Sequence, residues 1–300
     1  MTTGVLPPAE LQPAFGGLLD VASVHHDSDA FGGWTNGQFS WDTYACPVDL
    51  VLADFCTNQG DGTIASTSAA GIPSSWPFGV VTKSVCLTLG LKLEERRQIA
   101  LKQNEVGTQK AVEYELWAGG LSRTTAMPGS ARLQNRFLTD SLSTDVTPAS
   151  GKQSVYLSIA ALEQALADCG LGAKGVIHLT RSVASLATRS GVIEVVDGQL
   201  RTVLGTPVVA GVGYAPEVVR STSPTAPGDM PGPRPVQPMP LDQWAFATGP
   251  VSVLLGPSEI IDEQPMLRIS TNEITTLAGR PAAVYWDSCC TFAAHVDLTK

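Results

Sequence analysis

A long helix is the clearest element that the pattern of apolar and polar residues predicts. Over residues 93–117, Glu94 and Glu95 fall in the first turn, and Gly119 and Gly120 follow the last turn. Acidic side chains favour the positive end of a helix dipole, and glycine is common just beyond the C-terminal end. The apolar residues of this segment form a broken stripe, so we expect only part of the helix to pack on a core.

Shorter elements alternate in the segment that follows. An amphipathic helix is predicted over 157–168, because apolar residues recur there at helical spacing and Gly170 is placed to cap its end. A strand, a short helix, a hairpin around Asp197 and Gly198, and another strand are predicted at 175–179, 181–188, 192–204 and 208–212. This stretch is therefore expected to mix helices and strands in one unit.

The first part of the chain is predicted to be an extended arm followed by a long two-stranded loop. Residues 1–46 show little helical period, and aromatic residues are spaced along them between glycine pairs. Such aromatic side chains must bury against the rest of the chain or against a neighbouring molecule. Apolar stretches on both sides of the Gly-, Ser- and Thr-rich segment 57–77 predict two extended arms around a polar tip. We expect Trp76 and Phe78, which lie among prolines and a glycine, to bury against a neighbouring molecule.

The C-terminal part is predicted to consist mostly of strands. Eight prolines in the 25 residues of 216–240 exclude a regular ladder there and predict a loop. Five stretches beyond this loop are predicted as strands, at 244–248, 251–255, 259–261, 268–277 and 282–296. The fold class is therefore predicted to be α+β.

Charged residues are scarce in this chain. Lys, Arg, Asp and Glu make up 16% of the 300 residues, against about 25% in typical domains. A surface of this kind suits a protein that is covered by copies of itself, although a neutral, loop-rich enzyme has the same property. The net charge of −9 argues against sequence-independent binding of nucleic acid, which needs clustered Lys and Arg. We expect a soluble chain with no membrane span, and the first ten residues suggest no export signal.

The six cysteines are predicted to be buried free thiols, because the chain is expected to remain in a reducing compartment. They are Cys46, Cys56, Cys86, Cys169, Cys289 and Cys290. Cys289 and Cys290 would point to opposite faces of a strand, so they and the nearby His295 are not expected to bind zinc. His25, His26, Asp27 and Asp29 could bind a metal in principle, but in a glycine-rich arm they predict a solvated segment.

One glycine pattern matches a dinucleotide-binding motif but lies in the wrong context. Gly170, Gly172 and Gly175 fit GxGxxG, yet a helix is predicted before them and a strand after them, the reverse of what pyrophosphate binding needs. These glycines instead predict a helix end and a tight turn. Phosphate-loop, nucleophile-elbow and zinc-protease motifs are absent from the sequence. We therefore expect no enzyme activity and no catalytic, cofactor-binding or metal site.

The order of these elements resembles the major capsid proteins of tailed bacteriophages, the Hong Kong ninety-seven type fold that encapsulins share, especially those of actinobacterial phages. LEERRQIALKQNEVGTQKAVEYELWAG resembles the spine helix of that family. GVIHLTRSVASLATRSG and LGTPVVAGVGY resemble its axial domain. WAFATGPVSVLLGPSEII and NEITTLAGRPAAVYWDSCCTFAAHV resemble its return through the peripheral domain.

The resemblance implies five regions. They are an N-terminal arm at 1–46, an extended loop with flanking strands at 47–92, a peripheral domain with the spine helix at 93–152, an axial domain at 153–255 and return strands of the peripheral domain at 256–300. It implies a subunit that assembles with itself, as pentamers and hexamers, into the icosahedral shell of a tailed double-stranded DNA phage. An encapsulin-type nanocompartment shell and a cytosolic enzyme of unrecognised fold are the alternatives.

The same resemblance implies partners and a location. A portal protein is an expected partner, scaffolding and decoration proteins are candidates, and packaged DNA would be enclosed without sequence-specific contact. The protein would assemble in the bacterial host cytoplasm and remain in the virion capsid, away from membranes.

Some members of the family join a lysine of the extended loop to an asparagine of a neighbour, using a glutamate as the base. Here Lys83 lies at the base of the loop, Asn272 falls at the acceptor position, and Gly279 stands where the glutamate is expected. Glu273 would point to the opposite face of a strand. We therefore expect a shell without covalent links between subunits.

Overall fold

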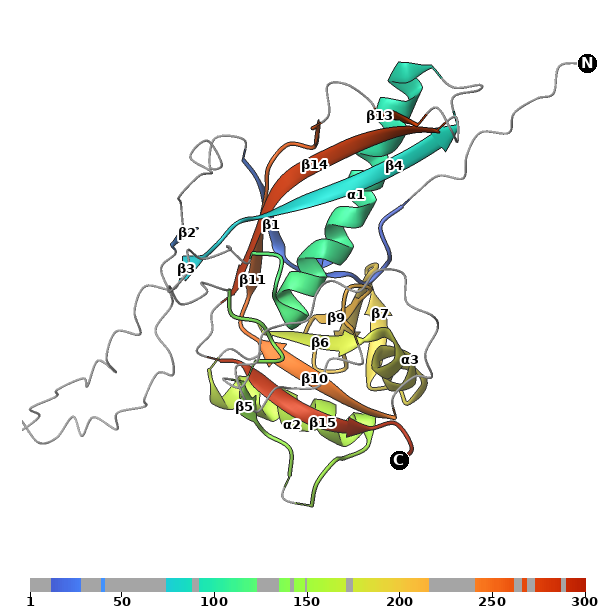
Figure 1. Ribbon diagram of the computed structural model, residues 1–300. Helices are drawn as coiled ribbons and strands as arrows, with labels where there is room; N and C mark the ends of the chain where they lie inside the picture. The colour runs from blue at the N-terminus through green and yellow to red at the C-terminus, as the bar shows by residue number, and fades with distance from the viewer. Residues whose placement is uncertain are drawn as a thin grey trace, which may run out of the picture.

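The computed structural model describes residues 12–27, 39–40, 74–87, 92–122, 135–140, 143–148, 150–170, 175–215, 241–261, 266–268, 273–286 and 290–300. Two β-sheets and a long helix that lies along the first sheet and reaches the second with its C-terminal end form the body of the protein (Figure 1). The helices are η1 (Leu18–Asp20, a 3-10 turn), α1 (Leu93–Ala118), α2 (Val155–Asp168) and α3 (Arg181–Arg189). The fold is mixed α+β, as predicted.

The first sheet is built around one long strand. It contains β1 (Ser23–His26), β4 (Phe78–Leu87), β11 (Val251–Leu255), β12 (Glu259–Ile260), β13 (Met266–Arg268) and β14 (Glu273–Trp286). β14 pairs antiparallel with four strands. β4 pairs with most of its length, and β11, β12 and β13 each pair with a shorter part of it. β1 is added at the edge, parallel to β11.

The second sheet has the order β5-β15-β10-β6-β9. Its strands are β5 (Thr144–Asp145), β15 (Phe292–Asp297), β10 (Asp242–Thr248), β6 (Val176–Thr180) and β9 (Val208–Gly211). Successive residues of β10 point to opposite faces, so Ala245 and Ala247 join the core beneath α2 and α3 while Phe246 joins the core around α1. Two short ribbons, β2 (Phe39–Ser40) with β3 (Ser74–Ser75) and β7 (Ile193–Val196) with β8 (Gln199–Thr202), complete the described strands.

The C-terminal half of α1 lies between the two sheets. Every residue of 111–118 is buried, whereas the first turns of the helix are largely exposed. Trp117 stacks on Tyr214, with ring centroids 4.6 Å apart, and meets the edge of Phe246 at 5.0 Å. The predicted long helix and its partial packing are both confirmed.

The short elements also follow their prediction. Ile159, Leu162 and Leu166 of α2 are at most 1% exposed, and Gly170 follows the helix with φ +76°. Asp197 and Gly198 have φ values of +50° and +77°, as a two-residue turn of the hairpin type requires. These three features of the sequence therefore specify local structure correctly.

One strand is longer than predicted. We expected a break between residues 277 and 282, but β14 runs through Arg280 and Pro281. The carbonyl of Pro281 accepts a hydrogen bond from the Gly256 N–H, and Gly256 lies in the gap between β11 and β12. The nitrogen of Pro281 faces the same gap, where a ladder hydrogen bond is not needed, so the proline does not end the strand.

The two sheets do not follow the region boundary expected at residue 255. β11, which precedes it, belongs to the first sheet, and β15, which comes after it, pairs with β10 in the second. The chain thus passes between the sheets twice at its C-terminal end.

The described part of the expected N-terminal arm packs on its own chain. Leu18 is fully buried, and β1 pairs with β11. Phe15, the aromatic residue of this segment, is 50% exposed, so its side chain does not show the burial against the rest of the chain that was one of the two expected alternatives. Residues 41–73, with most of the expected loop, and the proline-rich segment 216–240 lie outside the described residues.

The expected burial of Phe78 against a neighbour is wrong. Phe78 is 2% exposed and belongs to the core around α1, opposite Ala282 of β14. Trp76 is half-buried, and its backbone N–H and C=O bind the side chain of Asn135 at 2.6 Å and 2.9 Å. The flanking prolines and glycine suggested a loop, but the β-ladder already begins at Phe78.

Phe78→Ala should therefore destabilise the folded subunit. We expect the free energy of unfolding to fall by about 3–5 kcal/mol, because a buried aromatic side chain is lost and leaves a cavity. Val81→Thr is the matched control on the same strand, since Val81 is 60% exposed, and it should change the value by less than about 0.5 kcal/mol. Urea unfolding of dissociated subunits measures both, and equal stability of the two variants would contradict this packing.

Candidate functional site

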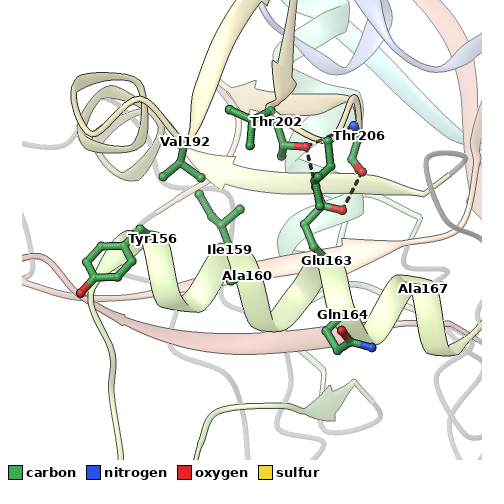
Figure 2. Close-up of a pocket in the computed structure, with 11 residues that line it drawn as sticks. Tyr156, Ile159, Ala160, Glu163, Gln164, Ala167, Val192, Thr202 and Thr206 are labelled. Carbon is green, nitrogen blue, oxygen red and sulfur yellow. Dashed lines mark hydrogen bonds between the residues drawn. The ribbon is translucent and has the colours of Figure 1, made fainter.

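A groove of about 360 Å³ runs along the outer side of α2, between this helix and the turn at 202–206 (Figure 2). Ile159 and Ala160 of α2 form part of its wall, together with Val192 on the opposite side. Tyr156 stands at one end and is 52% exposed. The lining is mostly apolar, which suits the binding of another apolar surface.

The carboxylate of Glu163 is occupied by hydroxyl groups of the facing turn. Thr202 Oγ1 donates to one of its oxygens at 2.5 Å, and Thr206 Oγ1 donates to the other at 2.8 Å (Figure 2). Both acceptor atoms of the acidic group in the groove are therefore engaged by the chain itself. Glu163 fixes the turn against α2 and is poorly placed to act as an acid or a base.

The turn at 202–206 is held in one shape and presents apolar side chains to solvent. Gly205 has φ +91°, its N–H donates to the Thr202 carbonyl, and the Thr202 N–H donates to the Thr206 carbonyl. Within this turn Val203 is 63% exposed and Leu204 is 71% exposed. An ordered turn that exposes two large apolar residues beside an apolar groove is typical of a contact surface.

A second group of residues ties three parts of the chain together inside the protein. Glu113 of α1 is fully buried, and its carboxylate accepts hydrogen bonds from the backbone N–H of Leu18 at 2.9 Å and of Gly213 at 2.8 Å. Gln109, one turn earlier, donates to the same carboxylate at 3.1 Å. A Cβ at position 213 would lie 2.3 Å from the Lys110 carbonyl, so the close approach of this segment requires glycine. Glu113 thereby joins α1 to the N-terminal segment and to the segment after β9.

Glu115 does the same for the segments that follow α1. It is fully buried and accepts hydrogen bonds from the Leu121 N–H at 2.7 Å, from the Ser122 hydroxyl and from the Asn135 amide at 3.1 Å. Asn135 in turn binds the backbone of Trp76. Glu115 therefore connects the end of α1 to the start of the strand region at 74–87.

Burial raises the pKa of both carboxyl groups above the ordinary value of 4.5, because the charged form loses its hydration. The hydrogen bonds described above act in the opposite direction for each group, without cancelling the effect of burial. The folded protein thus holds protons on Glu113 and Glu115 more tightly than the unfolded chain does.

His178 and Tyr214 extend this polar network into the second sheet. The two ring nitrogens of His178 lie 2.8 Å from the Tyr214 hydroxyl and 2.9 Å from the Thr248 hydroxyl. Burial lowers the pKa of His178 to about 3, so the ring is neutral at pH 7. Burial also raises the pKa of Tyr214, and the nearby Glu113 adds to this effect. A neutral, saturated histidine without access to solvent is a structural residue.

Comparison with known proteins identifies the fold. No family model and no curated protein matches this sequence. Among solved structures, the capsid of an empty GTA particle, computed with C5 symmetry, covers 99% of this chain and 94% of its own length, with a TM-score of 0.50 and 10% identity. The chain has a capsid fold.

Two further solved structures show weaker likeness over a similar length. Mycobacterium phage Ogopogo has a TM-score of 0.47 at 13% identity, covering 97% of this chain and 96% of that one. The capsid of Ralstonia phage GP4 also has a TM-score of 0.47, at 11% identity, with 99% and 95% covered. Of these three structures, the GTA capsid has the highest TM-score, and the likeness to it shows the fold.

The expected free thiols are wrong for two cysteines of this capsid fold. Cys169 and Cys290 form a disulfide, with their Cα atoms 6.2 Å apart, within the range that such a bond allows. The sequence missed it because the two residues are 121 positions apart and meet only when α2 packs beside the start of β15. Cys46, Cys56 and Cys289 lie outside the described residues.

The structure gives the positions of the other candidate residues. His25 and His26 are exposed on β1, and the described residues contain no group of three potential metal ligands. Gly170 is the helix end that the sequence predicted, and Gly175 leads into β6. In the same described part, no helix is long and apolar enough to cross a membrane.

Lys83 and Gly279, two of the residues considered for a covalent link, lie on the first sheet. Lys83 is exposed on β4 opposite Leu277, and Gly279 is opposite Val81. A Cβ at position 279 would meet the side chain of Ile261 at 2.2 Å, so this position is closed to a larger residue. Asn272 lies outside the described residues, and the absence of links between subunits remains a prediction.

The groove and the two buried glutamates are not predicted from the sequence. Two acidic residues within VEYELWA, where α1 is otherwise apolar, were the available signal for the glutamates. The groove forms where α2 packs beside the turn after β8, and no local sequence pattern predicts that contact.

Replacing Glu113 should change how stability depends on pH. Since its pKa is raised in the folded state, the contribution of this group is greatest below pH 4.5, and it is lost as the pH rises through the raised pKa. Glu113→Gln removes that dependence, although its amide disturbs the hydrogen bonds equally at every pH. Relative to the wild type, the variant should therefore gain stability as the pH rises from 4.5 towards 8, by at most about 1.4 kcal/mol for each pH unit.

Urea unfolding across this pH range provides the measurement. Glu105→Gln is the matched control, because Glu105 lies on the same helix and is exposed. Its difference from the wild type should be flat over the same range. A flat difference for Glu113→Gln as well would show that the carboxyl group is not held in its protonated form by the fold.

Proposed function

We propose that this protein is the major capsid protein of a tailed double-stranded DNA phage and assembles with itself into an icosahedral shell. The observation that carries the proposal is the capsid fold, which extends over 99% of the chain. A fold alone does not define a function, so the surface must also suit repeated self-association. Three properties of this chain support the proposal.

The first property is the low charge. Only 16% of the residues are charged, so neighbouring copies can bury surface without removing many ions from water. The second is the net charge of −9, which gives the wall little attraction for packaged DNA. The third is the groove beside α2 with its exposed apolar turn, because a shell repeats each such contact many times and each one can be weak.

The proposal includes an arrangement and a location. Five or six copies would surround an axis, and the second sheet with α2, α3 and the β7–β8 hairpin would lie nearest to it. The Val203–Leu204 turn and the groove would then lie between neighbours in a ring. A portal protein, scaffolding or decoration proteins and DNA would be further partners, with assembly in the host cytoplasm and the final location in the virion. On this proposal the protein is not an enzyme.

Particle size is the decisive measurement for this function. We expect the full-length protein, expressed in bacteria, to sediment as closed shells or as rings of five and six, and negative-stain microscopy should show them. The buried contacts between copies are the physical reason. A stable, folded species of 31 kDa at micromolar concentration would refute a shell subunit, and enzyme-sized oligomers without shells would favour the cytosolic enzyme. Cargo protein inside the shells, without a portal, would favour the encapsulin-type alternative.

The role of the groove is tested with its exposed turn. The double variant Val203→Ser, Leu204→Ser should fold normally, because both side chains point to solvent and the hydrogen bonds of the turn use the backbone and the two threonines. We expect the association constant of each contact between subunits to fall at least tenfold, which corresponds to about 1.4 kcal/mol, and the assembled fraction to fall with it.

Val195→Ser is the matched control for the turn. Val195 is 57% exposed on β7 of the same unit and does not line the groove. It should assemble to near the wild-type extent. Fraction assembled is read from sedimentation, and folding from circular dichroism. Wild-type assembly by the double variant would place the contact between copies elsewhere on the molecule.

A further inference from the structure

The disulfide joins a helix to the sheet beneath it. Cys169 is the C-terminal cap residue of α2, and Cys290 lies just before β15. Cys290 is 3% exposed, whereas Cys169 is half-buried. The bond thus fixes one end of α2 to the beginning of a strand over which the helix packs, and one of its two sulfur atoms is closer to solvent.

The disulfide is not the sole contact that holds α2 on the second sheet. Ile159, Leu162 and Leu166 hold α2 in the core of the second sheet. The hydroxyl of Ser158 also donates to the His295 carbonyl of β15, at 3.3 Å. Leu166 lies three residues before Cys169, so apolar packing holds this end of α2 on the sheet in addition to the disulfide, and the hydrogen bond of Ser158 holds the opposite end. The pair can therefore exist as two thiols or as a disulfide on the same backbone.

The sequence and the structure point to different redox states. Proteins inside bacterial cells keep their cysteines as thiols, and the structure shows a bond between two of them. The proposed function removes the conflict, because a shell subunit is made in a reducing compartment and later leaves it as part of a particle. We propose that Cys169 and Cys290 are thiols during synthesis and assembly and form their disulfide after release of the particle, an inference that rests on the proposed function.

The chemistry balances with dioxygen of the surrounding medium as the oxidant. The two thiols lose two electrons and two protons, the bond between the sulfur atoms forms, and dioxygen takes up the electrons and protons to become hydrogen peroxide. The half-buried Cys169 is the sulfur that an oxidant reaches first. As the bond between the sulfur atoms forms, the thiol of the buried Cys290 gives up the second electron and the second proton, which complete the reduction of dioxygen to hydrogen peroxide.

The disulfide forms at the stage when the shell must resist unfolding and its subunits no longer need to dissociate and reassociate. During assembly, subunits correct wrong contacts by dissociating, and a thiol pair leaves the chain free to adjust. After release, a link between residues 121 positions apart keeps the two ends of a long segment together and reduces the freedom of the unfolded chain. The released particle is thereby expected to be harder to unfold than the newly assembled one.

Thiol mapping tests the timing directly. Cells that express the full-length protein are quenched in acid, and the protein is then alkylated with N-ethylmaleimide in denaturant. A second sample is purified as particles in air before the same treatment, and a third is purified without oxygen. Peptide mass spectrometry should find Cys169 and Cys290 alkylated in the first and third samples and linked to each other in the second. A link already present in cells, or free thiols in the aerated particles, would overturn the proposal.

Thermal unfolding tests the consequence. A reductant should lower the melting temperature of aerated wild-type particles by about 5 °C or more. It should have no effect on Cys169→Ser or Cys290→Ser, which start at the lower temperature. Cys289→Ser is the matched control, since it changes the neighbouring cysteine and should respond to reductant as the wild type does. Equal responses of Cys289→Ser and Cys290→Ser would contradict the assigned pair.

The two proposals fail in different ways. If the protein does not form shells, sedimentation shows it, and the mapping still reports whether the two thiols are linked in air. If shells form and the thiols remain free in air, the redox inference is wrong while the proposed function stands.

Discussion

The burial of the last two turns of α1 between two β-sheets is the constraint on which the rest of the protein depends. A helix end enclosed on every side cannot keep a polar stripe, yet this one contains two carboxyl groups, and burying a charge without partners is costly. The cost is reduced because both groups receive backbone and side-chain donors from segments that come before and after the helix. The same hydrogen bonds that make the burial tolerable therefore also fix how the N-terminal segment, the strand region at 74–87 and the second sheet are arranged.

Elements with a strong local pattern could be predicted from the sequence. The long helix, α2 with Gly170 and the Asp197–Gly198 hairpin each depend on residues that are close together in the chain. Features that depend on distant partners were missed or wrong. Phe78 becomes part of the core only because β14 supplies Ala282 opposite to it, and β14 passes through Pro281 only because its neighbouring strands leave a gap there.

The candidate site also depends on residues that are distant in the sequence. The groove needs Glu163 of α2 to meet two threonines about forty positions later, and a single threonine in such a segment has no pattern that marks it as a partner. The disulfide is similar, because cysteine spacing alone cannot show which pairs approach each other. Composition, in contrast, indicated the general nature of the surface. A scarcity of charge is a property of the whole chain, so it can be counted from the sequence without knowing which residues contact each other.

The N-terminal segment has a consequence for how the chain is made. The backbone of Leu18 binds Glu113, which also binds the segment around Gly213, so Leu18 reaches its final contacts only after those parts of the chain exist. β1 likewise pairs with β11, which follows it by more than two hundred residues. Contacts between such distant parts of a sequence form slowly, and a chain leaving the ribosome cannot form them until most of it has been synthesised. Neither sheet is complete before the last strands, β14 and β15, have emerged. A nascent chain therefore has no finished surface to offer its neighbours, and premature association with other copies is delayed until each subunit is whole.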